Sequence, residues 1–161
     1  LQMPVVADER PNILLIVADD LGYADLGVHG SDIQTPNIDR LAADGILFTQ
    51  FHTAPLCAPT RAMLLSGNNN HVAGMARQHR SELAGHSVPG YEASLSDRIA
   101  PLPSLLSSVG YHTYTVGKWH LGLTSKTSPH AAGFSRSFSL LDGAGTHFDD
   151  VGFFEGGSTY W

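Results

Sequence analysis

Cysteine is the scarcest reactive residue in this sequence, because Cys57 is the only one among 161 residues. A lone cysteine cannot close a disulfide within the chain, and it cannot build a zinc site from several thiolates. Long apolar runs are missing as well, since no stretch approaches the roughly 18 consecutive apolar residues of a membrane-spanning helix. We therefore expect no disulfide scaffold, no thiolate zinc domain and no membrane span, and the cellular compartment stays open.

Positive charge is also sparse, because 9 Lys and Arg residues stand against 15 Asp and Glu residues, for a net charge of -6. Such a chain has no broad basic surface for nucleic acid, although a local cationic pocket for a small anion is compatible with it. Hydrophobic residues make up 42% of the sequence, enough to bury a core. The composition indicates one globular domain with no nucleic-acid partner.

Three segments have the pattern of β-strands. Residues 11–20, PNILLIVADD, are a continuous apolar run of the kind found in strands buried on both faces of a parallel sheet. Residues 46–53 and 111–116 alternate β-branched and aromatic residues with polar ones. Each of the three is predicted to be a strand.

Helices are predicted between these strands. Residues 35–45 have Thr35 as an N-cap and an apolar face that includes Leu41. Shorter helices are predicted over residues 59–67 and 103–109, whereas the Gly-, Asn- and His-rich stretch between them reads as loops. The alternation of strands and helices predicts an α/β fold, with a mostly parallel sheet flanked by helices.

Ligands of open α/β sheets bind at the carboxyl ends of the strands. Asp19, Asp20, Cys57 and Lys118 all follow or end predicted strands, so we expect them on one rim of the sheet. Two adjacent carboxylates are hard oxygen donors that suit Ca²⁺ or Mg²⁺, although Asp-Asp at this point, taken alone, is more often part of a turn or an N-cap.

Cys57 begins the pattern Cys-x-Pro-x-Arg, which also contains Pro59 and Arg61. A proline fits the first turn of a helix, so the side chain of residue 57 would lie at the positive helix end, with the planar guanidinium of Arg61 one turn further on. This arrangement suits an oxyanion. The alternative is that Cys57 is a small buried apolar residue.

Four stretches together resemble one family, the sulfatases of the alkaline-phosphatase superfamily. They are CAPTR (57–61), GYHTYTVGKWHLG (110–122), PNILLIVADDLGYADLGVHG (11–30) and TPNIDRLAADGILFTQFHT (35–53). The later GNNNHVAGM and GFSRSFSLLDGAGTHF are similar to bacterial arylsulfatase-type members. The resemblance implies an alkaline-phosphatase-like α/β fold.

The resemblance also implies the chemistry. Cys57 would be oxidised to formylglycine by a formylglycine-generating enzyme, and one oxygen of the hydrated aldehyde would attack sulfur while the other later expels sulfate. Arg61 and Lys118 would hold the nucleophile and the sulfate charge, and His120 would act as a base beside them. On an extended segment, Lys118 and His120 would point to the same face.

A metal ion is implied as well. Asp19, Asp20 and the oxygen at position 57 would bind Ca²⁺, with Mg²⁺ as an alternative, and the ion would polarise the sulfate. Further metal ligands and leaving-group residues of the family do not appear in these 161 residues. We therefore expect residues 1–161 to be the N-terminal portion of a sulfatase catalytic domain, inactive or poorly folded in isolation.

Two other functions stay open: a phosphonate or phosphate ester hydrolase of the same superfamily, and a non-catalytic fragment that binds sulfate esters. The expected ligand is a small-molecule or glycan sulfate ester, and the oligomeric state is open. Trp119 is predicted to serve packing. Among the remaining histidines, His71 and His147 are candidates for a substrate role, whereas surface or core positions are expected for the others, which are His29, His52, His79, His86, His112 and His130.

Overall fold

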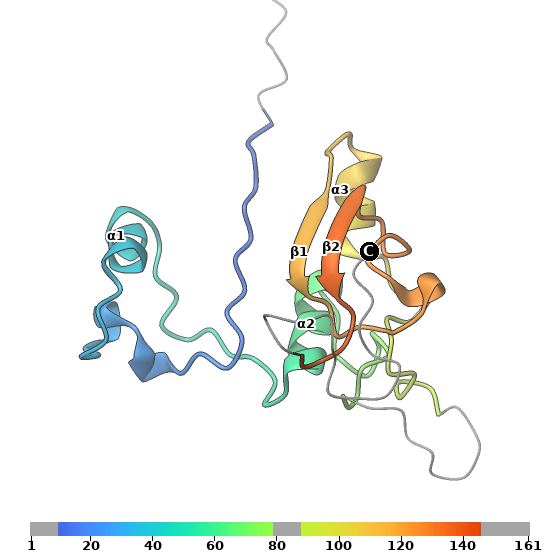
Figure 1. Ribbon diagram of the computed structural model, residues 1–161, viewed down its shortest axis with the longest axis horizontal. Coiled ribbons are helices and arrows are strands. Elements are labelled where there is room, and N and C mark those ends of the chain that lie inside the picture. Colours follow the sequence, from blue (N-terminus) through green and yellow to red (C-terminus); the bar gives the residue numbers. More distant parts are fainter. Residues whose placement is uncertain (1–9, 79–87, 146–161) are drawn as a thin grey trace, which may run out of the picture. The chain divides into compact units, whose positions relative to one another are not determined.

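The structure is a computed structural model that describes residues 10–78 and 88–145. By its internal contacts the chain divides into two compact units, Leu1–Thr49 and Gln50–Trp161. Figure 1 shows helix α1 in the first unit, and helices α2 and α3 with the two strands in the second.

The first unit is built from short helices. The 3-10 turns η1 (Tyr23–Asp25) and η2 (Gly27–His29) precede α1 (Pro36–Asp44). Thr35 occupies the predicted N-cap position, but its Oγ1 makes no capping bond. Instead it accepts a hydrogen bond from the Gly27 N–H at 2.8 Å and donates one to Asp39 Oδ1 at 2.9 Å. Thr35 therefore fastens η2 to α1.

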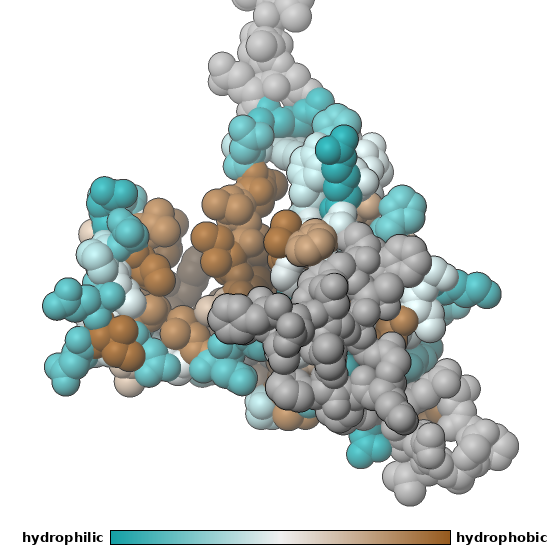
Figure 2. Space-filling view, viewed as in Figure 1, coloured by the Kyte–Doolittle hydropathy of each residue, from teal (hydrophilic) through white to brown (hydrophobic). Residues whose placement is uncertain are grey.

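Two strand predictions are wrong in this unit and at its boundary. Residues 11–18 and 46–53 adopt neither helix nor strand. The apolar side chains of residues 13–17 are 43–84% exposed, and Figure 2 shows apolar side chains at the surface of the molecule. The predicted core face of α1 is also exposed, with Leu41 at 67%. An apolar pattern makes a strand only when another strand pairs with it, and the described residues of this unit contain none.

The second unit contains α2 (Cys57–Ser66), α3 (Leu102–Ser108), β1 (Tyr114–Lys118), the 3-10 turn η4 (Ser125–Thr127) and β2 (Arg136–Leu140). Both helices and β1 confirm predictions to within a few residues. As expected, the described residues between α2 and α3 form neither helix nor strand. Helix α2 ends at Gly67, whose positive φ of 64° lets its N–H bond to the Met63 carbonyl.

Strands β1 and β2 form a parallel pair, with Tyr114 opposite Arg136 and Lys118 opposite Leu140. This pairing confirms the α/β class with a parallel sheet. Two more hydrogen bonds extend the pairing past β1, from the Trp119 N–H to the Leu140 carbonyl at 2.8 Å and from the His120 N–H to the Leu141 carbonyl at 3.1 Å. Figure 1 shows α2 near the arrowheads, the carboxyl ends of both strands.

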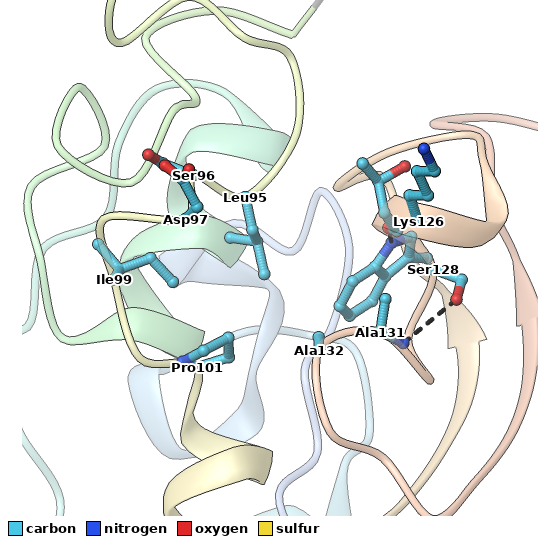
Figure 3. Close-up of a pocket in the computed structure, with 11 residues that line it drawn as sticks. Leu95, Ser96, Asp97, Ile99, Pro101, Lys126, Ser128, Ala131 and Ala132 are labelled. Atoms are coloured by element: carbon cyan, nitrogen blue, oxygen red, sulfur yellow. Dashed lines mark hydrogen bonds between the residues drawn. The ribbon is translucent and has the colours of Figure 1, made fainter.

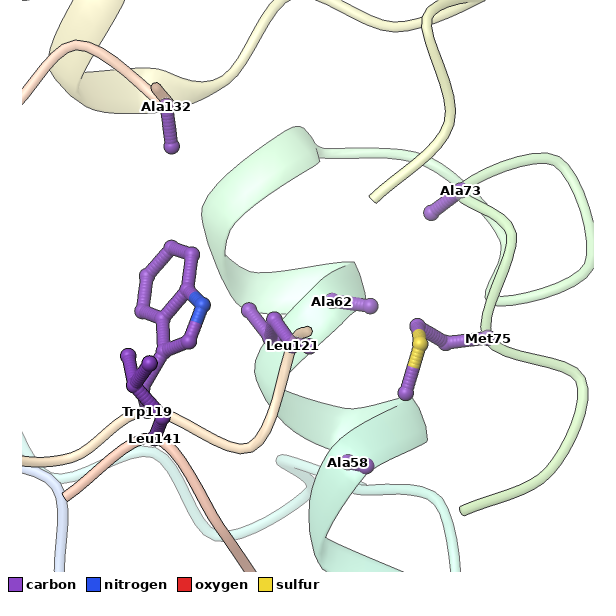
Figure 4. Close-up of a cluster of buried hydrophobic side chains, with 8 residues drawn as sticks. All are labelled: Ala58, Ala62, Ala73, Met75, Trp119, Leu121, Ala132 and Leu141. Carbon is purple, nitrogen blue, oxygen red and sulfur yellow. The ribbon is translucent and has the colours of Figure 1, made fainter. Parts of the chain in front are cut away.

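A small apolar core joins α2 to the loop that follows it, to residues just after β1 and β2, and to Ala132 before β2. Figure 4 shows its members, which are Ala58, Ala62, Ala73, Met75, Trp119, Leu121, Ala132 and Leu141. Trp119 is only 1% exposed, which confirms its predicted packing role, and its Nε1–H donates to the Thr127 carbonyl at 2.9 Å. Among the described residues, no helix is both long enough and apolar enough to cross a membrane.

Candidate active site

Cys57 is the first residue of α2, where the backbone N–H groups of the first turn are not used within the helix. Pro59 is buried in the same turn, and its missing N–H removes no helical bond there. The Thr60 hydroxyl donates to the Ala54 carbonyl at 3.0 Å and ties this turn to the preceding chain. The predicted place of residue 57 at the positive helix end is therefore confirmed.

The sulfur of Cys57 has two polar neighbours from distant parts of the chain. Its Sγ lies 3.4 Å from Nδ1 of His120, which is 63 positions away in the sequence. On another side, Nε2 of Gln78 donates to the same sulfur at 3.1 Å. The structure thus brings Cys57 and His120 together as the resemblance implies. Gln78 belongs to no motif that the sequence analysis used, so nothing in the sequence pointed to it.

Arg61 makes a second link between α2 and the end of β1. Its Nε donates to the Trp119 carbonyl at 2.9 Å, and its Nη2 donates to the Lys118 carbonyl. We call this pair of bonds the Arg61 clamp. The clamp fixes the backbone that carries Lys118 and His120, a positioning function that the sequence does not predict.

The chain turns at His120, whose φ is 56°, in the left-handed region. Because of this φ, the segment from Lys118 to His120 is not extended at His120, although extension was the basis for expecting both side chains on one face. That Lys118 and His120 point to the same face stays a prediction. The His120 ring lies directly against Gly143, where an added Cβ would overlap ring atoms Cε1 and Nε2. Gly143 leaves the space that the imidazole occupies.

Asp19 and Asp20 belong to the first unit, whereas Cys57, Lys118 and His120 belong to the second. Both carboxylate residues are exposed, and Asp20 has a φ of 56°, so the backbone turns directly after Asp19. Within residues 10–78 and 88–145, no group of three or more Asp, Glu, His or Cys residues converges as a metal site would require. A common rim for the aspartates and Cys57 stays a prediction.

The other candidate histidines are placed only in part. His71 is exposed, and its ring packs edge-on against Tyr91 at a centroid distance of 5.8 Å. His147, His79 and His86 lie outside the described residues. The structure therefore leaves the substrate role of His71 and His147 as a prediction.

A pocket of about 260 Å³ lies in the second unit, and Figure 3 shows residues that line it. Leu95, Ile99 and Trp119 give it apolar walls, and Asp97 and Lys126 add charge. None of the predicted catalytic residues lines this pocket. The sulfur of Cys57 and this cavity are therefore separate features.

Comparison with known proteins identifies the class. The sulfatase family model matches residues 11–158, so the chain belongs to the sulfatase family. It is 51% identical over 144 residues to an uncharacterized sulfatase of Schizosaccharomyces pombe, covering 87% of this chain and 26% of that protein. It is 39% identical over 143 residues to an arylsulfatase of Klebsiella aerogenes, covering 89% of this chain and 31% of that protein. The chain thus spans about a quarter to a third of these relatives.

Solved structures agree with this membership. The crystal structure of Ps i-CgsB matches with a TM-score of 0.68 and 35% identity, over 86% of this chain and 30% of that one. A second structure of Ps i-CgsB, in complex with k-i-k-neocarrahexaose, matches with a TM-score of 0.66 and 35% identity, over the same shares of the two chains. The likeness covers both units of the chain and confirms the α/β fold of a sulfatase.

Proposed function

We propose that the protein containing this chain hydrolyses sulfate esters by cleaving the S–O bond. The observation that carries the proposal is the contact between Cys57 and His120. Their Sγ and Nδ1 atoms lie 3.4 Å apart at a helix N-terminus, and the Arg61 clamp holds the segment on which His120 lies. Membership in the sulfatase family supports the same activity.

The residues at this site have complementary roles in the proposal. The N-terminus of α2 and the side chain of Lys118 favour the negative charge of a sulfate group. Arg61 donates hydrogen bonds to the Lys118 and Trp119 carbonyls. These bonds hold Lys118 and His120 in position beside residue 57. His120 lies close enough to residue 57 to accept a proton from it.

Residue 57 supplies the nucleophile once it has been converted. We propose that a formylglycine-generating enzyme oxidises Cys57, and that the hydrated aldehyde offers one oxygen for attack and a second for release of sulfate. The thiol Sγ in the structure occupies the place of one of these oxygens. Its neighbours, Gln78 and His120, are then the groups that contact the nucleophile.

Replacement of Gly143 with alanine tests the role of the His120 ring position. The new methyl group would overlap the imidazole, so the ring must move away from residue 57. We expect kcat/KM for a sulfate ester to fall by about 10- to 100-fold, because displacement of a catalytic group by about 1 Å has effects of this size. Steady-state kinetics on the full-length protein measure it.

Ala144→Ser is the matched control, because it makes a small change at the next residue of the same loop. It should keep kcat/KM within about twofold, the range expected of a change away from the reacting groups. A kcat/KM equal to that of the wild type in Gly143→Ala would show that catalysis does not depend on the position of the His120 ring.

We propose Ca²⁺ as the metal, bound in part by Asp19 and Asp20. Their carboxylates are exposed, and they are hard donors of the type calcium prefers. When bound, the ion would polarise an oxygen of the sulfate. The residues present fit part of a calcium site, and the remaining ligands would come from elsewhere in the full-length protein.

Removal of calcium with a chelator should abolish sulfate release, and added Ca²⁺ should restore it. Asp19→Asn and Asp20→Asn should each raise the calcium concentration for half-maximal activity by about tenfold or more, because each removes one anionic ligand. Calcium titrations of activity and of binding heat measure the change. Asp44→Asn, an exposed carboxylate at the end of α1, is the control. Equal calcium requirements for all variants would contradict the assignment.

The substrate class and the extent of the enzyme are also proposals. The structural relative crystallised with k-i-k-neocarrahexaose supports an oligosaccharide sulfate as substrate. Because the chain spans only 26–31% of the first relatives, we propose that it is the N-terminal portion of a larger catalytic domain. Activity is then a property of the full-length protein.

The deciding experiment compares matched sulfate and phosphonate esters with the same leaving group. The full-length protein from its native host, with residue 57 identified by mass spectrometry, should turn over the sulfate ester faster. Preference for the phosphonate ester would assign the protein to the neighbouring activity of the superfamily. Binding of a sulfated oligosaccharide without turnover of either ester would indicate that the protein binds sulfate esters but does not hydrolyse them.

A further inference from the structure

Gln78 contacts the reactive position directly, although it lies 21 residues beyond Cys57 and outside every motif. Its Nε2 donates to Sγ at 3.1 Å, a shorter approach than that of His120 at 3.4 Å. Gln78 is half-buried. The sulfur is therefore in contact with one neutral amide and one imidazole.

The loop before Gln78 is fastened so that this amide reaches residue 57. The Met75 N–H donates to the Asn70 carbonyl at 2.8 Å, and the Asn70 side-chain amide donates to the Met75 carbonyl at 3.1 Å. The Ala76 N–H donates to the Gly90 carbonyl at 2.8 Å. Met75 itself is 1% exposed and packs in the core with α2, as Figure 4 shows. Gln78 thus follows an anchored segment.

The chemistry of an amide suits this position. A carboxamide carries no charge and neither gains nor loses a proton at neutral pH, so it cannot compete with His120 as a base. Its N–H groups bind an oxygen acceptor, and such a bond strengthens as negative charge develops on that oxygen. A donor placed here would orient an oxygen at position 57 and stabilise it during attack.

We propose that Gln78 is a further residue of the active site, whose amide N–H binds and orients the nucleophilic oxygen at position 57. This inference rests on the proposed function, because it requires that Cys57 is converted to formylglycine. It assigns to Gln78 a direct contact with the nucleophile, at the position where its Nε2 now donates to Sγ of Cys57.

The test uses the full-length protein with Gln78→Met, which keeps the length of the side chain but has no donor. Gln78→Glu keeps the shape and replaces the donor with an anionic acceptor. We expect Gln78→Met to lower kcat by about 10- to 100-fold with little change in KM, the effect of losing a hydrogen bond to a developing charge. Gln78→Glu should be slower still, because its charge opposes that of the nucleophile.

Arg77→Gln is the matched control. Arg77 is the exposed neighbour of Gln78, and its guanidinium lies 6.0 Å from the Tyr91 ring. It should keep kcat within about twofold. Mass spectrometry of the residue 57 peptide in each variant gives the converted fraction, to which every kcat is normalised. A normalised kcat in Gln78→Met equal to that of the wild type would overturn the inference.

A second measurement needs no turnover. A hydrogen bond from Gln78 favours the hydrate of formylglycine over the free aldehyde, and only the aldehyde reacts with an aminooxy probe. Labelling should therefore be faster in Gln78→Met than in the wild type, while Arg77→Gln labels at the wild-type rate. Equal rates overturn the role of Gln78.

The two hypotheses fail in different ways. If wild-type protein with formylglycine at position 57 releases no sulfate, the proposed function is wrong. The labelling rates would still decide the role of Gln78. An unconverted thiol in protein from the native host would overturn both.

Discussion

Cys57→Ala is expected to lower kcat/KM for a sulfate ester by at least about 1000-fold, because the methyl side chain cannot be converted into a nucleophile. Residual activity would come from binding at the helix N-terminus and the cationic residues alone. The fold should change little, since the residue is half-buried and alanine is a good helix former at the first position of α2. Sulfate release and thermal unfolding of the full-length protein measure the two effects.

Cys57→Ser separates the two steps of the proposed reaction. A serine has a single hydroxyl, so it can attack sulfur but has no second oxygen with which to expel sulfate. The variant should be as slow as Cys57→Ala in steady state, yet it should gain the mass of one SO₃ group on residue 57 after exposure to substrate. Steady turnover by the serine variant at the wild-type rate would contradict the formylglycine proposal.

Trp119→Ala should lower the free energy of unfolding by about 3–5 kcal/mol, the range measured when a buried aromatic ring is removed. The side chain is 1% exposed and belongs to the small core, with Phe134 edge-on at 6.2 Å. Activity should be lost together with stability, because Trp119 connects Lys118 to His120. Chemical denaturation of the full-length protein measures the stability change.

Trp119→Phe is the graded control for this prediction. It keeps an aromatic ring but removes the Nε1–H that donates to the Thr127 carbonyl at 2.9 Å. The expected loss is about 1–2 kcal/mol, from one buried hydrogen bond and a smaller ring. Equal stability of the alanine variant and the wild type would show that this cluster does not hold the second unit together.

Much of the candidate site could be predicted because its motifs contain both residues with reactive side chains and residues that restrict the backbone conformation. Pro59 indicates the first turn of a helix, so the sequence alone predicts Cys57 at the helix N-terminus. The pairing of Cys57 with His120 followed from resemblance to the sulfatases. The Arg61 clamp could not be predicted, since the bonds from its guanidinium to two carbonyls exist only after α2 packs at the end of β1.

The limits of the fold prediction have a similar cause. Residues 136–140, RSFSL, lie in a Gly- and Ser-rich stretch with no strong hydrophobic period, so the sequence does not predict β2, yet pairing with β1 makes them a strand. Residues 11–18 show the reverse, with strong strand propensity and no strand in the structure. Strand propensity depends on one segment alone, whereas a strand forms only when a second segment pairs with it.

The Arg61 clamp also has a consequence for the order of folding. It joins Arg61 to carbonyls 57 and 58 positions away, so it forms only after a chain loop of that length has closed. Closing such a loop costs entropy before any contact repays it, whereas α2 and its glycine cap begin from neighbouring residues. The helix that bears Cys57 can therefore exist before the catalytic arrangement does. A complete site is then a sign that the second unit has finished folding.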